Sequence, residues 1–294
     1  MDISVIIPSL HSWPLIQRTL SSLASQSFTG TYEVIVVDSS GPEAATTIRE
    51  GFPAVTVIPA DRRLLPGEAR NLGLHSATGN LIAFVDADAE PAPDWLQQIS
   101  NLHRAHPEWA GVGGSIANGN ADHFYGRIAH LLEFSGYTPS WPARDARVIP
   151  TCNLSFKREA LPDRPFLEGT WGNEDVELVE RLRAEGKVIR FEPSLRVIHY
   201  SKTDFGAILA QQRKLGESTG RIRRLYDFPG SWLARTPFAW LLTPIIRKGI
   251  LLRRALTHEQ GAFSLMILGA PWIGCALWVW MLGFRDGARG AART

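Results

Sequence analysis

The sequence predicts an α/β fold whose first half forms a parallel sheet covered by helices on both faces. Short apolar runs typical of buried strands alternate with segments that repeat apolar residues at helical spacing, and the connections are short. Polar residues directly follow three of the apolar runs. Ligands of such sheets bind beyond the carboxyl ends of the strands, so these polar residues mark the expected functional edge.

The first ninety residues give the clearest pattern. We expect buried strands at residues 3–8, 33–38, 54–58 and 81–88. Between them we expect helices at 13–26, 43–50 and 66–75. Pro66 stands where a helix commonly begins, which supports the third helix.

Beyond Pro93 the alternation loosens. We expect helices at 94–105, at 121–134 and from 174 onward, with Asp94 as a candidate helix cap. Further strands are expected at 111–117, 151–156, 188–191 and 196–200.

The composition is that of an ordinary globular protein. Its 294 residues, 45% hydrophobic and 20% charged, fit one large domain or one domain with an appendage. A net charge of +2 is not by itself a nucleic-acid signature, and we expect no nucleic-acid partner. The two cysteines, Cys152 and Cys275, form no disulfide framework, which favours a reducing compartment. We expect no signal peptide, because the first residues lead straight into an apolar strand.

The strand at 81–88 ends in two carboxylates, Asp86 and Asp88. If the extended geometry continues, residues two apart share one face, so both side chains aim at one small volume. Paired carboxylates repel each other unless a cation lies between them, and hard oxygen ligands suit Mg²⁺ or Mn²⁺. Asp-x-Asp alone is a weak pattern, but the apolar strand before it strengthens the metal interpretation.

Two further sites are ambiguous by themselves. Glu174 and Asp175 stand at a helix start, where negative charge is favoured in any case, but a carboxylate there can also act as a general base. His199 lies near the end of a strand, where it is either structural or a metal ligand. The sequence lacks both Gly-x-Gly-x-x-Gly after its first strand and a P-loop motif, which disfavours dinucleotide and P-loop folds.

Taken in order, several motifs resemble those of a family 2 glycosyltransferase of the GT-A fold, over about residues 1 to 225. Each motif is weak alone, but the ordered set is specific. The matching pieces are Val5-Ile6-Ile7-Pro8-Ser9, Val34-Ile35-Val36-Val37-Asp38-Ser39-Ser40, Gly67-Glu68-Ala69-Arg70-Asn71-Leu72-Gly73, Ala77-Thr78-Gly79-Asn80, Asp86-Ala87-Asp88, Asn153-Leu154-Ser155-Phe156-Lys157-Arg158 and Asn173-Glu174-Asp175-Val176-Glu177-Leu178.

The resemblance implies a Rossmann-like mixed sheet with helices on both faces and a nucleotide-sugar site. Pro8 and Ser9 would line the nucleotide pocket, and Asp38 would contact the base or ribose. Arg70 would help to hold the nucleotide sugar. Ser39-Ser40 departs from the family's usual Asp-Gly-Ser pattern, which leaves the identity of the base open.

The resemblance also implies a metal-dependent, inverting reaction. Asp86 would contact ribose or sugar, while Asp88 and His199 would ligate Mn²⁺ or Mg²⁺ at the diphosphate. Asp175 would be the catalytic base that deprotonates the acceptor hydroxyl, supported by Glu174. The cation would stabilise the charge of the departing nucleoside diphosphate.

The C-terminal part has a different character, and we expect a catalytic domain at 1–228 followed by a membrane-associating segment at 229–294. Residues 262–284 carry no charge and are long enough to cross a bilayer. An interruption at 271–274 allows either a kinked span or a re-entrant hairpin. Residues 232–252 are typical of interfacial helices whose basic residues face anionic lipid. A buried helical hairpin in a soluble oligomer is the alternative. Arg213 and Lys214 either hold a diphosphate or phospholipid, or form a solvated basic face.

We therefore expect a glycosyltransferase at the cytoplasmic face of the cell membrane that moves sugar from a nucleotide-diphosphate sugar to a lipid-linked or cell-envelope glycan. The alternatives are a nucleotidyltransferase of similar layered fold and a non-catalytic membrane scaffold. A nucleotidyltransferase would carry an early Gly-rich, basic phosphate loop, and residues 7–11 do not form one.

Overall fold

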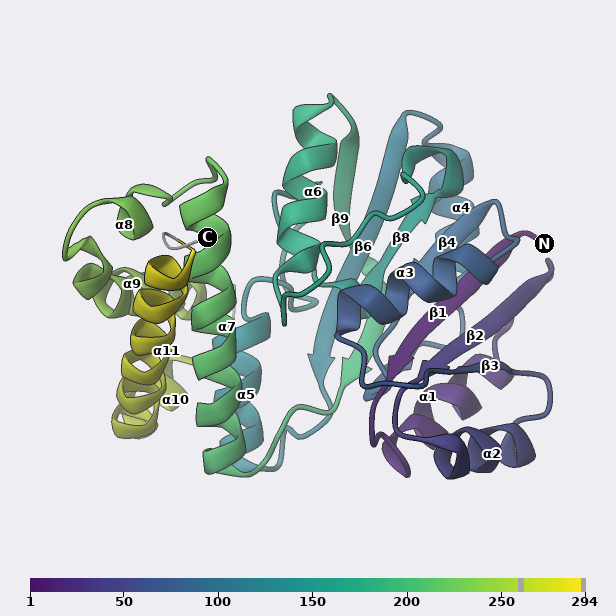
Figure 1. Ribbon diagram of the computed structural model, residues 1–294, viewed down its shortest axis with the longest axis horizontal. Coiled ribbons are helices and arrows are strands. Elements are labelled where there is room, and N and C mark those ends of the chain that lie inside the picture. Colours follow the sequence, from purple (N-terminus) through teal and green to yellow (C-terminus); the bar gives the residue numbers. More distant parts are fainter. Residues whose placement is uncertain (259–261, 292–294) are drawn as a thin grey trace. The chain divides into compact units, whose positions relative to one another are not determined.

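The computed structural model describes residues 1–258 and 262–291 (Figure 1). The chain divides into two compact units, which we describe separately. Unit 1 comprises Met1–Ala117, Pro142–Gly169 and Glu174–His199, and unit 2 comprises Asn118–Trp141, Thr170–Asn173 and the described residues from Tyr200 onward. The domain boundary expected at residue 228 lies inside unit 2 by this division.

Unit 1 is built on a mixed sheet of nine strands, counted over the described residues, in the order β3-β2-β1-β4-β8-β6-β9-β5, with β7 paired to β9 (Figure 1). The strands are β1 (Ile3–Ser9), β2 (Tyr32–Asp38), β3 (Thr56–Pro59), β4 (Leu81–Phe84), β5 (Ala89–Pro91), β6 (Trp109–Asn118), β7 (Arg144–Asp145), β8 (Leu154–Lys157) and β9 (Val188–His199).

The first four strands pair in parallel, which confirms the expected alternation of strands and helices. The pairing then turns antiparallel between β4 and β8 and between β6 and β8. Val34 to Val37 in β2 are all buried, as expected of a parallel strand covered on both faces.

Five helices of unit 1 flank this sheet. They are α1 (Leu15–Ala24), α2 (Pro42–Gly51), α3 (Pro66–Ser76), α4 (Trp95–Ala105) and α6 (Glu174–Ala184). Gln26 links α1 to α4, since its side chain accepts from the Leu96 N–H at 2.9 Å. On the other face α3 packs closely on the sheet, because a Cβ on Gly73 would lie 2.6 Å from Ile6. Figure 1 shows α3 and α6 on the same side of the sheet.

Three local expectations were wrong. The strand expected at 81–88 ends at Phe84, and a turn at Ala87 and Asp88 leads into β5. The two strands expected at 188–191 and 196–200 form one continuous strand, β9. Asp94 precedes α4 but caps no backbone N–H; its carboxylate accepts instead from Gln98 Nε2 at 3.0 Å.

The strand expected at 151–156 begins as a 3₁₀ turn, η1 (Thr151–Asn153), and continues as β8. The reason lies in Asn153, which is fully buried. Its Nδ2 donates to the backbone oxygens of Ser115 at 2.9 Å and Leu195 at 3.0 Å, and its Oδ1 accepts from Trp95 Nε1 at 2.9 Å. Because the buried Asn153 side chain makes all three hydrogen bonds, it fixes the η1 turn that precedes β8.

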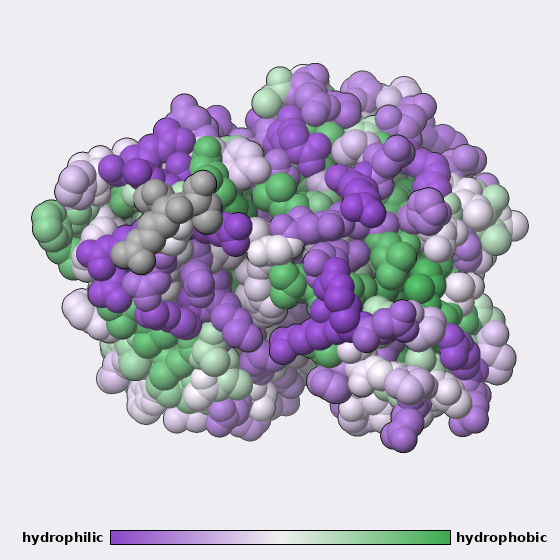
Figure 2. Space-filling view, in the orientation of Figure 1, coloured by the Kyte–Doolittle hydropathy of each residue, from purple (hydrophilic) through white to green (hydrophobic). Residues whose placement is uncertain are grey.

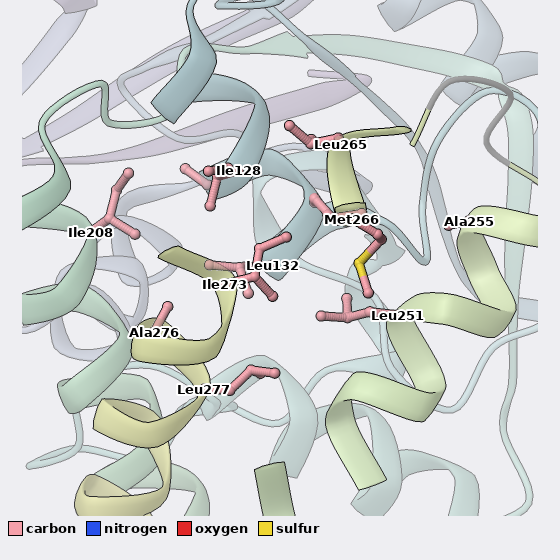
Figure 3. Close-up of a cluster of buried hydrophobic side chains, with 12 residues drawn as sticks. Ile128, Leu132, Ile208, Leu251, Ala255, Leu265, Met266, Ile273, Ala276 and Leu277 are labelled. Atoms are coloured by element: carbon pink, nitrogen blue, oxygen red, sulfur yellow. The ribbon is translucent and has the colours of Figure 1, made fainter. Parts of the chain in front are cut away.

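Unit 2 is helical around an apolar cluster (Figure 3). Its elements are α5 (Phe124–Phe134), α7 (Phe205–Leu225), α8 (Trp232–Arg235), η3 (Ala239–Leu242), α9 (Thr243–Thr257), α10 (Ala262–Leu268) and α11 (Ala270–Gly290). The cluster takes Leu132 from α5, Ile208 from α7, Leu251 from α9, Met266 from α10 and Leu277 from α11.

Glycines bring the backbones of α7 and α11 into close contact. A Cβ on Gly216 or Gly220 of α7 would lie 2.1 or 2.0 Å from the carbonyl oxygens of Trp280 or Phe284. A Cβ on Gly283 or Gly287 of α11 would meet α7 carbonyl oxygens at 2.1 or 1.9 Å. Each helix therefore presents a pair of glycines four residues apart to its neighbour, and no side chain fits at these positions.

The apolar stretch expected to span a bilayer, residues 262–284, is divided in the structure. Gly269 separates α10 from α11, and the two helices are bent by 84°. Within the described residues, only this bent pair taken together, and no single helix, has the length and hydropathy of a membrane span.

The glycine contact predicts a position-dependent effect of one added methyl group on α11. Gly283→Ala should lower the free energy of unfolding by about 1–3 kcal/mol, because its Cβ overlaps backbone atoms of α7. Gly274→Ala is the matched control, since no atom lies within 4 Å of its Cβ, and it should be neutral or stabilising by up to about 1 kcal/mol. Thermal unfolding of both variants measures this, and equal effects would contradict the packing.

Candidate active site

The carboxyl ends of β1 and β2 meet at one edge of the unit 1 sheet. Ser9 and Asp38 are partners in the parallel register, and Ser9 Oγ donates to Asp38 Oδ2 at 2.5 Å. The backbone N–H and hydroxyl of Ser40 also donate to Asp38, at 2.9 and 3.1 Å. Asp38 is 2% exposed, and its carboxylate joins the ends of the two strands through these hydrogen bonds. Pro8 is half-buried beside them.

Asp86, Asp88 and His199 form a cluster at the same edge. Each offers one ligand atom, and these atoms all lie within 4.8 Å of one another. The cause is the strand register: Ala89 of β5 pairs with His199 at the end of β9, which leaves Asp88 Oδ1 3.2 Å from His199 Nε2. Two carboxylates and an imidazole suit Mn²⁺ or Mg²⁺, so the residues fit the expected metal.

Arg70 on α3 joins this cluster to the start of α6. Its Nη2 lies 2.7 Å from Asp86 Oδ1, and its Nη1 lies 2.6 Å from Glu174 Oε1. The guanidinium is 3% exposed and lies 5.7 Å from the centre of the Phe166 ring. Burial opposes its charge, but Asp86 and Glu174 outweigh burial and raise the pKa of Arg70. The expected contact of Arg70 with the nucleotide sugar therefore competes with two ion pairs.

Asp175 lies beside Glu174 in the first turn of α6 and is half-buried. Its carboxylate accepts from the backbone N–H of Val176 at 2.8 Å and of Thr151 at 3.3 Å. Burial and the neighbouring Glu174 raise the pKa of Asp175 to about 7, although Arg70 and the N–H groups act in the opposite direction. A carboxylate with that pKa can exchange a proton near neutral pH.

The buried thiol of Cys152 indicates how closely these acids gather. Burial, and then the charges of Asp86, Asp88 and Asp175, raise the pKa of Cys152 well above its usual value. The negative charges of three carboxylates thus all oppose ionisation of the same thiol, that of Cys152 in η1. Together with the ion pairs of Arg70 to Asp86 and Glu174, this places the metal cluster and the predicted base in one negatively charged site.

Some contacts of this site were not predicted from the sequence. Thr151 donates its backbone N–H to Asp175, and the Phe166 ring lies beside the Arg70 guanidinium. Neither Thr151 nor Phe166 stands in a motif that gives it a role. Ser40 follows Asp38 in one of the matching motifs but was given no role of its own, although it donates twice to Asp38. A hydroxyl two residues after a buried Asp was the available signal.

Arg213 and Lys214 lie on α7 in unit 2, where each has a local partner. The Arg213 guanidinium pairs with Asp286 of α11, and the Lys214 ammonium lies 5.3 Å from the centre of the Trp171 ring. Asn173 donates to Thr219 Oγ1 at 3.1 Å, so residues 171–173, which precede α6, are held by α7. The diphosphate role of Arg213 and Lys214 stays a prediction.

Comparison with curated proteins gives relatives that share about a quarter of their residues with this chain. Glycosyltransferase AglE of Haloferax volcanii is 26% identical over 226 residues, which cover 73% of this chain and 72% of AglE. The succinoglycan biosynthesis protein ExoM of Rhizobium meliloti is 25% identical, covering 71% of each chain. The pre-mycofactocin glycosyltransferase of Mycobacterium tuberculosis is 27% identical, but the match spans only 46% of that longer protein.

Solved structures share the fold. The mannosyltransferase PcManGT from Pyrobaculum calidifontis, in complex with GDP-Man and Mn²⁺, superimposes with a TM-score of 0.63 at 21% identity, over 98% of this chain and 86% of its own. S. aureus TarS 1–349 gives 0.57 at 16% identity, over 100% and 92%. These likenesses confirm the GT-A fold.

The family model described as glycosyl transferase family 2 matches residues 4–163, more than half of the chain. That segment contains all of β1 but its first residue, together with β2, Arg70 and the Asp86–Asp88 turn. The chain belongs to glycosyl transferase family 2 and is a glycosyltransferase.

Proposed function

We propose that this glycosyltransferase transfers sugar with inversion from a nucleotide-diphosphate sugar to a hydroxyl of a lipid-linked or cell-envelope glycan, with Mn²⁺ or Mg²⁺. The observation that carries the proposal is the cluster of Asp86, Asp88 and His199, joined through Arg70 to the acidic start of α6. Membership of the family argues against the nucleotidyltransferase and the non-catalytic scaffold.

The donor end of the site uses the carboxyl edge of the sheet. Asp88 and His199 would hold the cation, and Asp86, which already pairs with Arg70, would face the ribose or sugar. When bound, the cation would stabilise the negative charge of the departing diphosphate as a Lewis acid. Pro8, Ser9 and Asp38 would form the wall beside the nucleotide, and Arg213 and Lys214 are further candidates for the diphosphate.

The acceptor end uses Asp175 as the catalytic base. Its pKa of about 7 leaves a substantial ionised fraction at neutral pH while keeping the carboxylate basic enough to take a proton. The acceptor oxygen attacks the anomeric carbon from the face opposite the diphosphate, which inverts the configuration. Arg70 is a positioning residue here, because it holds Glu174 beside Asp175 and Asp86 beside the metal ligands.

Support for a lipid-linked or envelope acceptor comes from two sources. Relatives such as the succinoglycan biosynthesis protein ExoM are named for polysaccharide assembly. The C-terminal helices also expose many apolar side chains, which supports action at a membrane surface. We propose that this surface is the cytoplasmic face of the cell membrane.

A metal role predicts that transfer stops in EDTA and returns with Mn²⁺ or Mg²⁺. Asp88→Asn should lower Mn²⁺ affinity and kcat/KM by about 100-fold or more, because loss of a direct anionic ligand costs at least as much as loss of an outer-shell partner. Asp94→Asn, outside the cluster, is the control. Calorimetric Mn²⁺ binding and product formation measure these effects, and activity that is unchanged in EDTA would contradict the metal role.

The base assignment predicts two separate effects of Asp175→Asn. Transfer should fall by about 100-fold or more while donor binding persists, since the proton acceptor is removed. The folded pKa of about 7 lies above the ordinary value of 3.8, so ionising Asp175 destabilises the fold. This penalty is absent below the unfolded pKa, grows with pH, and is complete above about 7.

The variant should therefore gain more thermal stability at pH 8 than at pH 5, by roughly 2–4 °C for each kcal/mol released. Melting curves at the two pH values, together with an assay of transfer, check both effects. Normal turnover by Asp175→Asn would show that another group is the base.

The coupling between Glu174 and Asp175 predicts a shift in the pH profile. The kcat/KM of the native protein should fall as pH drops below about 7, because Asp175 becomes protonated. Glu174→Gln removes the neighbouring negative charge and should move this acidic limb to lower pH. Glu180→Gln on the same helix should leave the limb in place, and an unmoved limb in Glu174→Gln would contradict the coupling.

A further inference from the structure

The C-terminal helices of unit 2 are apolar on two sides. Their inner sides build the cluster in Figure 3. Of the nineteen large apolar side chains that are exposed in the described residues, thirteen lie between Trp232 and Trp278. A soluble surface helix normally turns a polar side outward, so this second apolar side needs a partner.

Helix α9 shows the pattern most clearly. Ile245, Leu252 and Leu256 recur at helical spacing and are 71%, 38% and 64% exposed, whereas Leu251 and Ala255 are buried in the cluster. The exposed side of α9 thus carries large apolar side chains of its own. Burying these leucine and isoleucine side chains against a partner would be favourable relative to leaving them in contact with water.

The next two helices, α10 and α11, also expose large apolar side chains. α9, α10 and α11 pack against one another in unit 2. Phe263 and Ile267 of α10 are one turn apart and exposed, and Trp278 of α11 is 56% exposed. Figure 2 shows apolar residues gathered over α10 and α11. We call these residues of α9, α10 and α11 the outward face: Ile245, Leu252, Leu256, Phe263, Ile267 and Trp278.

Cations accompany the outward face. Lys248 and Arg253 of α9 are exposed beside Ile245 and Leu252. From residue 213 to 254 the sequence has ten basic residues against Glu217 and Asp227. Apolar and aromatic side chains mixed with lysine and arginine match the interface of a bilayer that contains anionic lipid.

The length and packing of α11 argue that it does not cross such a bilayer. The uncharged part of α11, residues 270–284, is 15 residues long and spans about 22 Å, against roughly 30 Å for a hydrocarbon core. The second half of the whole helix α11 lies against α7 through Gly283 and Gly287. α7 exposes Lys214, Glu217 and Arg221 to water, which keeps this pair of helices out of hydrocarbon.

We propose that the outward face binds the surface of an anionic bilayer and lies in its plane, rather than crossing it. The inference deepens the proposed function and rests on it for the acceptor, since a lipid-linked glycan is presented at that surface. Binding combines burial of the apolar side chains with attraction of Lys248 and Arg253 to lipid headgroups.

Vesicle binding of the full chain, measured without donor, tests this surface separately from catalysis. The protein should float with vesicles of equal parts phosphatidylglycerol and phosphatidylcholine, bind pure phosphatidylcholine at least about tenfold more weakly, and be extracted by alkaline carbonate. Ile245→Glu with Leu256→Glu should reduce binding by about tenfold or more, and so should Lys248→Glu with Arg253→Glu. Leu15→Glu, an exposed apolar position in unit 1, is the matched control.

Donor cleavage in detergent, without vesicles, is measured on the same variants to separate the two proposals. Retained cleavage with lost vesicle binding supports the surface, whereas absent cleavage with intact vesicle binding would overturn only the proposed function. Three results would overturn the surface: resistance to carbonate, unchanged binding by both double variants, or an oligomer in lipid-free buffer that Ile245→Glu with Leu256→Glu converts to monomer. The last result would make the outward face an interface between copies of the chain.

Discussion

The site depends on the balance between one buried cation and the carboxylates gathered around it. Asp86, Asp88, Glu174 and Asp175 come together at the edge of the unit 1 sheet, and Arg70 pairs with two of them. Carboxylates at such distances destabilise one another unless positive charge is supplied. Arg70 compensates part of the charge. Burial, and then the charge of Glu174, still raise the pKa of Asp175, and Asp86 and Asp88 form with His199 a cluster suited to a divalent cation.

The fold explains why these groups meet. Parallel strands β1, β2 and β4 deliver polar residues to one edge, and the antiparallel pair β5–β9 brings His199 to Asp88. Asn153 fixes the 3₁₀ turn that offers the Thr151 N–H to Asp175. Asp175 therefore accepts a hydrogen bond from a turn that is held in place by the buried, fully hydrogen-bonded side chain of Asn153.

The sequence was sufficient for the fold class and for the strand ends, because a run such as Val34-Ile35-Val36-Val37 has few other interpretations. The meeting of Asp86 and Asp88 was expected from an extended strand, but a turn brings them together instead. The pairing of Arg70 with Glu174 joins residues 104 positions apart, which periodicity cannot reveal. The glycine pairs of α7 and α11 were visible as Gly-x-x-x-Gly, yet their meaning depends on which helices become neighbours.

A crystal structure of the protein with Mn²⁺ and a nucleoside diphosphate tests the central claim most directly, through the anomalous signal of manganese. The charge balance predicts a manganese peak within bonding distance of Asp88 and His199, with the diphosphate on its open side and the Arg70 ion pairs intact. A nucleotide bound elsewhere, with no manganese at Asp88, would contradict it.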